Sequence, residues 1–141
     1  MVGTPRGAQR HVWIAASILF CVGCAMTVKE VSLSEDPDYF LVGSTEGEAK
    51  SIFSASDEKV TLRVVFAPNF VGSSRTFTVE WFGPDGSVYL REPAKTQWGS
   101  NETLFAALDI AGSEPSRMPG SWRVRLLYEG AELANRPFTI E

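Results

Sequence analysis

Histidine and cysteine are nearly absent from this chain of 141 residues, which contains one His and two Cys. All three lie near the N-terminus, as His11, Cys21 and Cys24, so neither residue type occurs after position 24. Nucleophilic sites of the Ser-His-Asp or Cys-His kind need these side chains, as do zinc and copper sites built on them. Chemistry in the rest of the chain would have to rest on carboxylates, Lys, Arg, Tyr and Ser.

The apolar run near the N-terminus is short. It covers the twelve residues from Val12 to Gly23, whereas a membrane-spanning helix needs about 20 apolar residues. A basic segment with Arg6, Arg10 and no acidic residue precedes it. This combination is typical of a secretory signal. The alternative is an uncleaved membrane anchor, in which the run extends as far as Lys29.

Both cysteines lie at the end of this run, in the segment SILFCVGCAMT. A redox Cys-x-x-Cys pair belongs in a folded domain, and a zinc site needs further Cys or His ligands, whereas the chain has only His11, in the basic segment before the apolar run. The segment instead resembles the lipobox of bacterial lipoproteins, in which a small residue, here Gly23, precedes the lipid-bearing cysteine. Cys21 departs from that pattern, because the family usually has an aliphatic residue there.

The resemblance implies that Cys24 is the lipid attachment site, with a diacylglyceryl thioether and an amide-linked acyl chain as the membrane anchor. It also implies a lipid-anchored place in the cell envelope. The outer membrane is favoured, if the source has one, because Ala25 rather than Asp follows the cysteine. The alternative is ordinary signal cleavage near Cys24 or Met26, which would release a soluble exported protein.

Acidic residues outnumber basic ones in the part that remains after the signal. Residues 1–23 contain two of the 13 basic residues, Arg6 and Arg10, and none of the 17 acidic ones. The remaining 11 basic and 17 acidic residues give a formal net charge of −6. Such a domain has no electrostatic reason to bind nucleic acid. No spacing of acidic residues resembles a calcium loop, so we expect no metal and no cofactor.

Alternating apolar residues predict short β-strands after residue 58. The run 59–68 has one apolar face and is closed by Pro68, and the runs 75–82 and 87–92 flank the turn sequence Gly-Pro-Asp-Gly, which predicts a hairpin. In the second run of this hairpin, the alternation places Val88 and Leu90 on the same face. The two tryptophans on apolar faces, Trp81 and Trp122, are predicted to pack in the core.

The C-terminal segment PGSWRVRLLYEGAELANRPFTIE predicts a second hairpin that turns at Glu129-Gly130. Residues 102–112 fit either a helix or a strand, and their neighbours favour a strand. Between residues 36 and 58, the apolar islands YFLV and SIF predict short edge strands.

Together these patterns predict an all-β protein, an Ig-like β-sandwich of about seven antiparallel strands after an N-terminal signal or anchor segment. Residues 1–23 form the lipoprotein-type signal peptide, 24–58 the tether and first short strands, and 59–141 the sandwich core. The last 23 residues look like the end of Ig-like domains of bacterial envelope proteins, in which a Gly-x-Trp-x-Val strand pairs with a final strand ending in an aromatic. Such folds carry many unrelated functions.

Four residues are candidates for binding a partner. Trp98, in the polar loop KTQWGSNE, is placed to stack on a sugar ring or fill a pocket of a partner, or else to cap one end of the sandwich. Arg63, Arg123 and Arg125 are predicted on the outward face of adjacent strands, where a cluster could hold a carboxylate or phosphate.

The alternative for these arginines is a solvated sheet face, neutralised by Glu80, Glu129 and Glu132.

The sequence therefore predicts a non-catalytic, lipid-anchored envelope module that binds or scaffolds a protein or glycan partner. One alternative is a structural subunit that joins an envelope complex by adding an edge strand to a partner sheet. Another is a hydrolase that uses carboxylates alone. An exposed apolar patch would favour a protein partner, an acid-lined cleft an enzyme, and an aromatic shelf around Trp98 a glycan.

Overall fold

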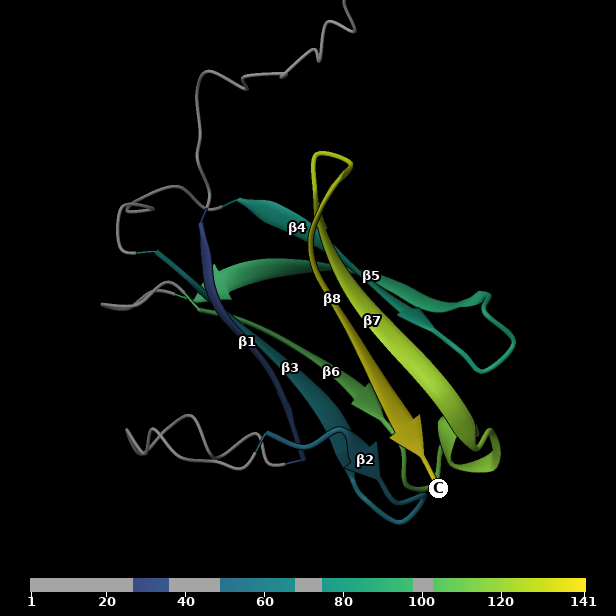
Figure 1. Ribbon diagram of the computed structural model, residues 1–141. Coiled ribbons are helices and arrows are strands. Elements are labelled where there is room, and N and C mark those ends of the chain that lie inside the picture. Colours follow the sequence, from purple (N-terminus) through teal and green to yellow (C-terminus); the bar gives the residue numbers. More distant parts are fainter. Residues whose placement is uncertain (1–26, 36–48, 68–74, 98–102) are drawn as a thin grey trace, which may run out of the picture.

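The computed structural model describes residues 27–35, 49–67, 75–97 and 103–141. Nearly all regular structure in these ranges is β-strand, and the predicted fold class is confirmed: the chain forms an all-β, Ig-like sandwich (Figure 1). The predicted signal segment, both cysteines, the YFLV island and Trp98 lie outside the described residues.

Eight strands are described, one more than the seven or so expected. The 3-10 helix Glu114–Arg117 lies between the sixth and seventh strands. In chain order the strands are β1 (Val28–Ser34), β2 (Ile52–Phe53), β3 (Lys59–Phe66), β4 (Thr76–Phe82), β5 (Val88–Gln97), β6 (Thr103–Asp109), β7 (Gly120–Tyr128) and β8 (Ala131–Ile140).

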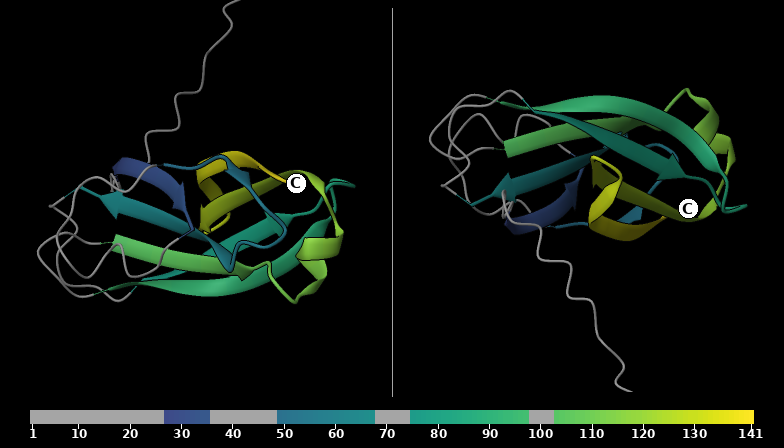
Figure 2. Two further views of the ribbon diagram at one scale, coloured as in Figure 1. Left: turned by 90° about the horizontal axis from the view of Figure 1, so that it is seen from below. Right: turned by 90° about the horizontal axis from the view of Figure 1, so that it is seen from above.

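The strands form two layers that share β5. One layer contains β1, β3 and β6, and the other contains β4, β7, β8 and β2. Strand β5 pairs with β4 along most of its length and then with β6 at Thr96 and Gln97, so it passes from one layer to the other. The pairs are antiparallel except for β2 with β8, which is parallel. Both views of Figure 2 place β1 and β8 on the same side of the sandwich.

Large apolar side chains from both layers fill the space between them. Trp81 of β4 and Trp122 of β7 are 0% and 1% exposed, which confirms their predicted place in the core. Phe138 of the last strand contacts both indoles, with ring centroids 6.1 Å from Trp81 and 6.2 Å from Trp122. Aromatic contacts of this kind add to the stability that comes from burying apolar area.

Both predicted hairpins are confirmed, because β4 pairs with β5 and β7 pairs with β8 in antiparallel register. In the first turn, the Asp85 carboxylate accepts hydrogen bonds from the backbone N–H and the hydroxyl of Ser87 at 2.9 and 2.7 Å. In the second turn, Glu129 and Gly130 have φ values of 48° and 82°. Positive φ at both central residues is typical of the tight turns that match the twist of a hairpin.

The segment that fitted either helix or strand is the strand β6, which pairs with β3 over seven residues from Thr103 to Asp109. Its alternating side chains decide the outcome: Leu104, Ala106 and Leu108 are buried between the layers. A strand directs every second side chain to one face, so this alternation fits a strand that pairs with β3.

The predicted orientation of Val88 was wrong. Trp81 pairs with Leu90, but the next residue of β4, Phe82, pairs with Val88, so β5 contains an extra residue, Tyr89, at this point. A bulge of this kind reverses the alternation beyond it. Leu90 packs against the core, whereas Val88 is on the outward face and is 41% exposed.

A short segment before β3 links the two outer strands. The backbone N–H of Lys50 donates to the carbonyl of Leu33 in β1 at 2.9 Å, and the N–H of Thr139 in β8 donates to the carbonyl of Ser51 at 2.9 Å. The strand β2 then continues alongside Thr139 and Ile140. Segment 50–53 therefore joins the two layers at the end of the sandwich where the chain terminates.

Candidate functional site: an arginine surface on β4, β5 and β7

Three arginines, one carboxylate and two apolar side chains gather on the outward side of three neighbouring strands. They occupy cross-strand pairs in the β4–β5 and β4–β7 registers, and residues paired in this way lie on the same face of a sheet. The patch, here named the arginine surface, consists of Glu80, Phe82, Val88, Arg91, Arg123 and Arg125.

Glu80 lies at the centre of this surface and is 1% exposed. Its Oε2 accepts a hydrogen bond from Nη2 of Arg91 at 2.8 Å, and its Oε1 accepts from Nε and Nη2 of Arg125 at 3.2 and 3.0 Å. The bond from Arg91 is the largest cause that lowers the pKa of Glu80, and Arg125 acts in the same direction against burial. Glu80 is therefore a buried carboxylate, ionised and held by two guanidinium groups.

Phe82, next to Glu80 on the outward face, supports two of the arginines. The Cζ atom of Arg123 lies 4.4 Å from the centre of its ring, and that of Arg125 lies 5.2 Å away. Guanidinium groups are attracted to aromatic faces within about 6 Å. The Phe82 ring therefore supports the guanidinium of Arg123 without using any of its N–H donors in a hydrogen bond.

Among the described residues, the arginines of this surface have many donors without a partner. A guanidinium has five N–H groups and no acceptor, and Arg125 uses two of its donors on Glu80 while Arg91 uses one. Within the described part of the chain, the side chain of Arg123 makes no hydrogen bond or ion pair. Three positive charges thus surround a single negative one, which is already satisfied. The arrangement can accept further carboxylate or phosphate oxygens.

An apolar side chain borders this charged region. Val88 pairs with Phe82 on the outward face and is 41% exposed, and it is one of two large hydrophobic residues exposed in the described ranges, the other being Ile52. Because of the bulge at Tyr89, Val88 lies beside the arginines instead of in the core. The surface therefore offers both an apolar contact and charged donors.

The predicted arginines do not form one cluster. Arg123 and Arg125 of β7 lie together, but Arg63 is on β3, which pairs with β1 and β6 in the other layer, so the expectation of adjacent strands is wrong for Arg63. Its Nη1 donates to Oε1 of Glu30 at 2.9 Å.

Two members of the surface, Arg91 and Phe82, were not singled out from the sequence. The hairpin register pairs Arg91 with Glu80, and this pairing was the available signal. Of the predicted neutralising acids, Glu80 binds Arg125 as expected, whereas Glu132 accepts a hydrogen bond from Nδ2 of Asn135 at 2.9 Å.

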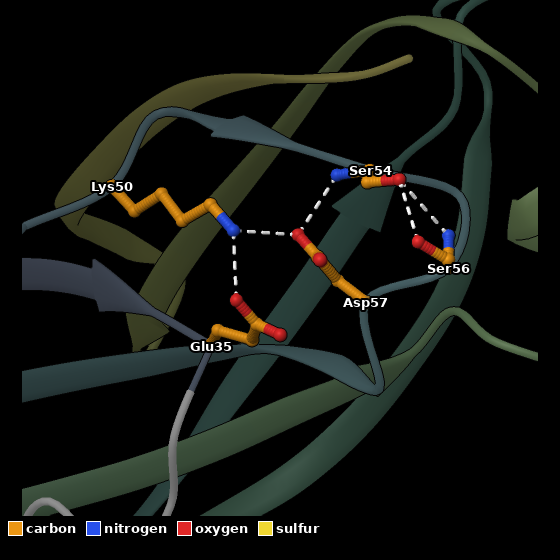
Figure 3. A network of polar contacts seen from close by, with 5 residues as sticks. All are labelled: Glu35, Lys50, Ser54, Ser56 and Asp57. Atoms are coloured by element: carbon orange, nitrogen blue, oxygen red, sulfur yellow. Dashed lines mark hydrogen bonds and ion pairs between the residues drawn. The ribbon is translucent and has the colours of Figure 1, made fainter.

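A second polar cluster lies beside β2 (Figure 3). The ammonium group of Lys50 contacts Oδ2 of Asp57 at 2.6 Å and Oε2 of Glu35 at 2.8 Å. The Asp57 carboxylate also accepts from the backbone N–H of Ser54 at 2.8 Å. Since Lys50 belongs to the segment that links β1 to β8, the charges hold this link in place, and we assign them a structural role.

In the parts of the chain with described structure, no group of three or more His, Cys, Asp or Glu side chains is placed to hold a metal ion. Among the same residues, no helix is long and apolar enough to cross a membrane.

Solved structures provide the comparison for this fold. The chain is similar to an immunoglobulin-like protein from Pseudomonas aeruginosa, with a TM-score of 0.55 and 14% identity over 85% of this chain and 99% of that one. A β-glucosidase from Kluyveromyces marxianus matches with a TM-score of 0.38 and 14% identity, over 79% of this chain and 14% of the enzyme. The first likeness shows the fold, and the second score is too low to support an argument. No protein-family model and no curated protein matches the chain.

Proposed function

We propose that this protein is a lipid-anchored, non-catalytic binding module of the cell envelope, and that the arginine surface is its binding face. The single observation that carries the binding role is Arg123, whose guanidinium is held against Phe82 at 4.4 Å with its donors unused among the described residues. An arginine already held against an aromatic ring loses less conformational freedom when it binds an anion than one that is mobile. The anchoring role rests on the lipobox resemblance around Cys24.

The position of β1 suggests how an anchored domain would stand on its membrane. β1 begins at Val28, four residues after Cys24, and four extended residues reach about 14 Å. Figure 1 shows that β1 begins at the same end of the sandwich as the β7–β8 turn at Glu129. This end would face the membrane, and the turn at Asp85 would face away from it. Phe82 is three residues before Asp85, so the arginine surface would remain accessible.

Addition of an edge strand to β8, which would make the protein a structural subunit, has less support. The N–H of Thr139 points toward the side of β8 on which β2 lies. Residues two apart in a strand direct their N–H groups to the same side, so Pro137 occupies the corresponding position just before Thr139. Proline has no N–H, so Pro137 cannot donate a hydrogen bond to a strand added at this edge. Proline at an open edge is a common feature that prevents further strand pairing.

The anchor is tested by the intact mass of the protein extracted from membranes, for the wild type and for Cys24→Ala. We expect a mass of residues 24–141 plus acyl chains, and we expect the variant to lose this form. An unmodified mass that begins downstream of Cys24 would make the protein a soluble exported domain. A mass that retains residues 1–23 would indicate an uncleaved anchor, and either result would contradict lipidation.

The orientation is tested with two labelled variants of the anchored protein, Glu129→Cys and Asp85→Cys. Each variant carries a fluorophore in vesicles whose lipid headgroups bear a quencher. We expect stronger quenching at position 129 than at position 85, because only the first site would lie near the bilayer. Equal quenching at the two sites would contradict the proposed orientation and leave the mass result unaffected.

A further inference from the structure

We infer that the partner of the arginine surface is a protein segment with clustered Asp or Glu carboxylates next to an aliphatic side chain. This inference rests on the proposed function, because it identifies what the binding face recognises. The surface supplies three guanidinium groups, of which one, Arg123, has no hydrogen bond or ion pair among the described residues. Planar guanidinium groups match carboxylates with two parallel hydrogen bonds.

Charge makes this face different from the rest of the domain. Residues 24–141 have a formal net charge of −6, whereas the arginine surface has three positive charges and one negative charge. An acidic partner is repelled by the domain as a whole and attracted at this face. Such a local contrast favours a defined orientation of binding more than a general affinity.

The apolar part of the surface favours a protein over a glycan. The two large hydrophobic residues that are exposed in the described ranges, Ile52 and Val88, are both aliphatic. Sugar rings are recognised by stacking on exposed aromatic faces, and the ring of Phe82 is only 9% exposed and is covered by Arg123 and Arg125. An aliphatic side chain flanked by acids fits Val88 and its neighbouring arginines better than a sugar does.

Glu80 makes the surface rigid before any partner arrives. It holds Arg91 and Arg125 at fixed positions through three hydrogen bonds, while its own charge is shielded from solvent. Part of the entropy cost of ordering these arginines is therefore met during folding. The carboxylate also sets the spacing of the two groups, because each of its oxygens holds one guanidinium.

The test is calorimetric titration of the full chain in detergent with three probes at low salt: hexaglutamate, hexaglutamine and a peptide of alternating Glu and Leu. We expect both acidic peptides to bind, hexaglutamine not to bind, and the affinity to fall as NaCl is added. Arg123→Gln should weaken binding about tenfold, which corresponds to about 1.4 kcal/mol, because the variant loses a charged donor to the carboxylates. Val88→Ser should weaken only the Glu–Leu peptide, about threefold.

The matched control is Arg117→Gln, which removes one exposed positive charge from the 3-10 helix outside this surface. It should bind both acidic peptides like the wild type. Equal losses in Arg117→Gln and Arg123→Gln would overturn the inference, because binding would then follow net charge alone. Thermal unfolding confirms that each variant is folded before the titration.

A polyuronate glycan, polygalacturonate, separates this inference from the proposed function. Binding of the glycan but neither acidic peptide, with loss in Arg123→Gln, would overturn the protein partner and keep the binding face. If no acidic probe binds, both the inference and the binding face are wrong. The lipid anchor would still be decided separately by the intact mass.

Discussion

Two polar clusters of this protein have opposite charge patterns. On the arginine surface one carboxylate, Glu80, lies between two arginines, and beside β2 one ammonium group, that of Lys50, lies between two carboxylates (Figure 3). They differ in burial, because the side chain of Glu80 is 2% exposed and that of Lys50 is 35% exposed. The same kind of ion pairing therefore operates in two different dielectric environments.

The difference shows what each cluster contributes to the molecule. A buried charge without a partner destabilises a fold by several kcal/mol, so Arg91 and Arg125 are requirements for Glu80. An ion pair near solvent contributes about 0–1 kcal/mol. The contacts of Lys50 therefore stabilise the link between β1 and β8 only slightly and do not determine the fold. The first cluster fixes the positions of two arginines on the surface, and the second stabilises the segment that links β1 to β8.

The largest effect is expected when Glu80 loses both arginines. The double variant Arg91→Met/Arg125→Met should lower the free energy of unfolding by about 1.5–3 kcal/mol, because the Glu80 carboxylate then loses its hydrogen bonds to charged donors. Adding Glu80→Met should restore most of this loss, since an apolar replacement of a buried ion pair is often neutral. Urea denaturation measures all three proteins. A triple variant as unstable as the double one would show that packing, not charge, causes the loss.

The second largest effect is expected from low pH, which should lower the stability of the protein by protonating Glu80. The pKa of Glu80 in the folded protein is lowered, chiefly by the hydrogen bond from Arg91, below the ordinary value of about 4.3. Its contribution to stability is therefore complete above that value and is lost as the pH falls through the lower folded pKa. Between about pH 5 and pH 2, the stability of Glu80→Gln should fall less steeply than that of the wild type. Parallel curves would exclude Glu80 as the cause.

A smaller effect is expected from Lys50→Met. Loss of the contacts to Glu35 and Asp57 should lower the free energy of unfolding by about 1 kcal/mol or less, and high salt should reduce the difference. Hydrogen exchange should become faster at the amides of Thr139 and Glu141, which donate to segment 51–53. Unchanged protection at these two amides would show that the cluster does not stabilise the link between β1 and β8.

The smallest effect on stability is expected from Arg123→Gln. Among the described residues this arginine has no salt bridge to lose, and its contact with Phe82 is worth about 0.5–1 kcal/mol at an exposed site. Its thermal midpoint should fall by no more than a few degrees, while its binding of acidic peptides falls about tenfold. A loss of stability as large as that of the double variant would mean that Arg123 supports the fold instead of a partner.

The strands and hairpins were predictable because their signals are local. The alternation of Trp122, Val124 and Leu126 and the turn at Glu129-Gly130 specify the last hairpin without reference to distant residues. The bulge at Tyr89 was not predictable in this way. The extra residue, Tyr89, packs against Trp122 with ring centroids 5.4 Å apart, and this contact joins strands from different hairpins.

The candidate site was predictable only in part. The alternation indicated that Arg123 and Arg125 point outward, and this is correct because both flank Phe82 on the outward face. Arg63 has the same local pattern, yet it lies on β3 in the other layer. Glu80 was expected to neutralise an arginine, but its burial follows from two arginines that cover it from opposite sides.

Sequence alone therefore determined the all-β class, the two hairpins and, with the exception of Val88, the predicted apolar faces of these hairpins, since a period of two and turn residues act over a few positions. It also carries the lipobox-like segment around Cys24, which is a prediction that the intact mass will test. Tertiary structure decided which strands are neighbours, and so which charges meet. β4 lies between β5, the next strand along the chain, and β7, which follows much later. Arg91 is therefore 11 residues from Glu80 and Arg125 is 45 residues away, and only the pairing of β4 with both strands brings the two arginines to the two oxygens of Glu80.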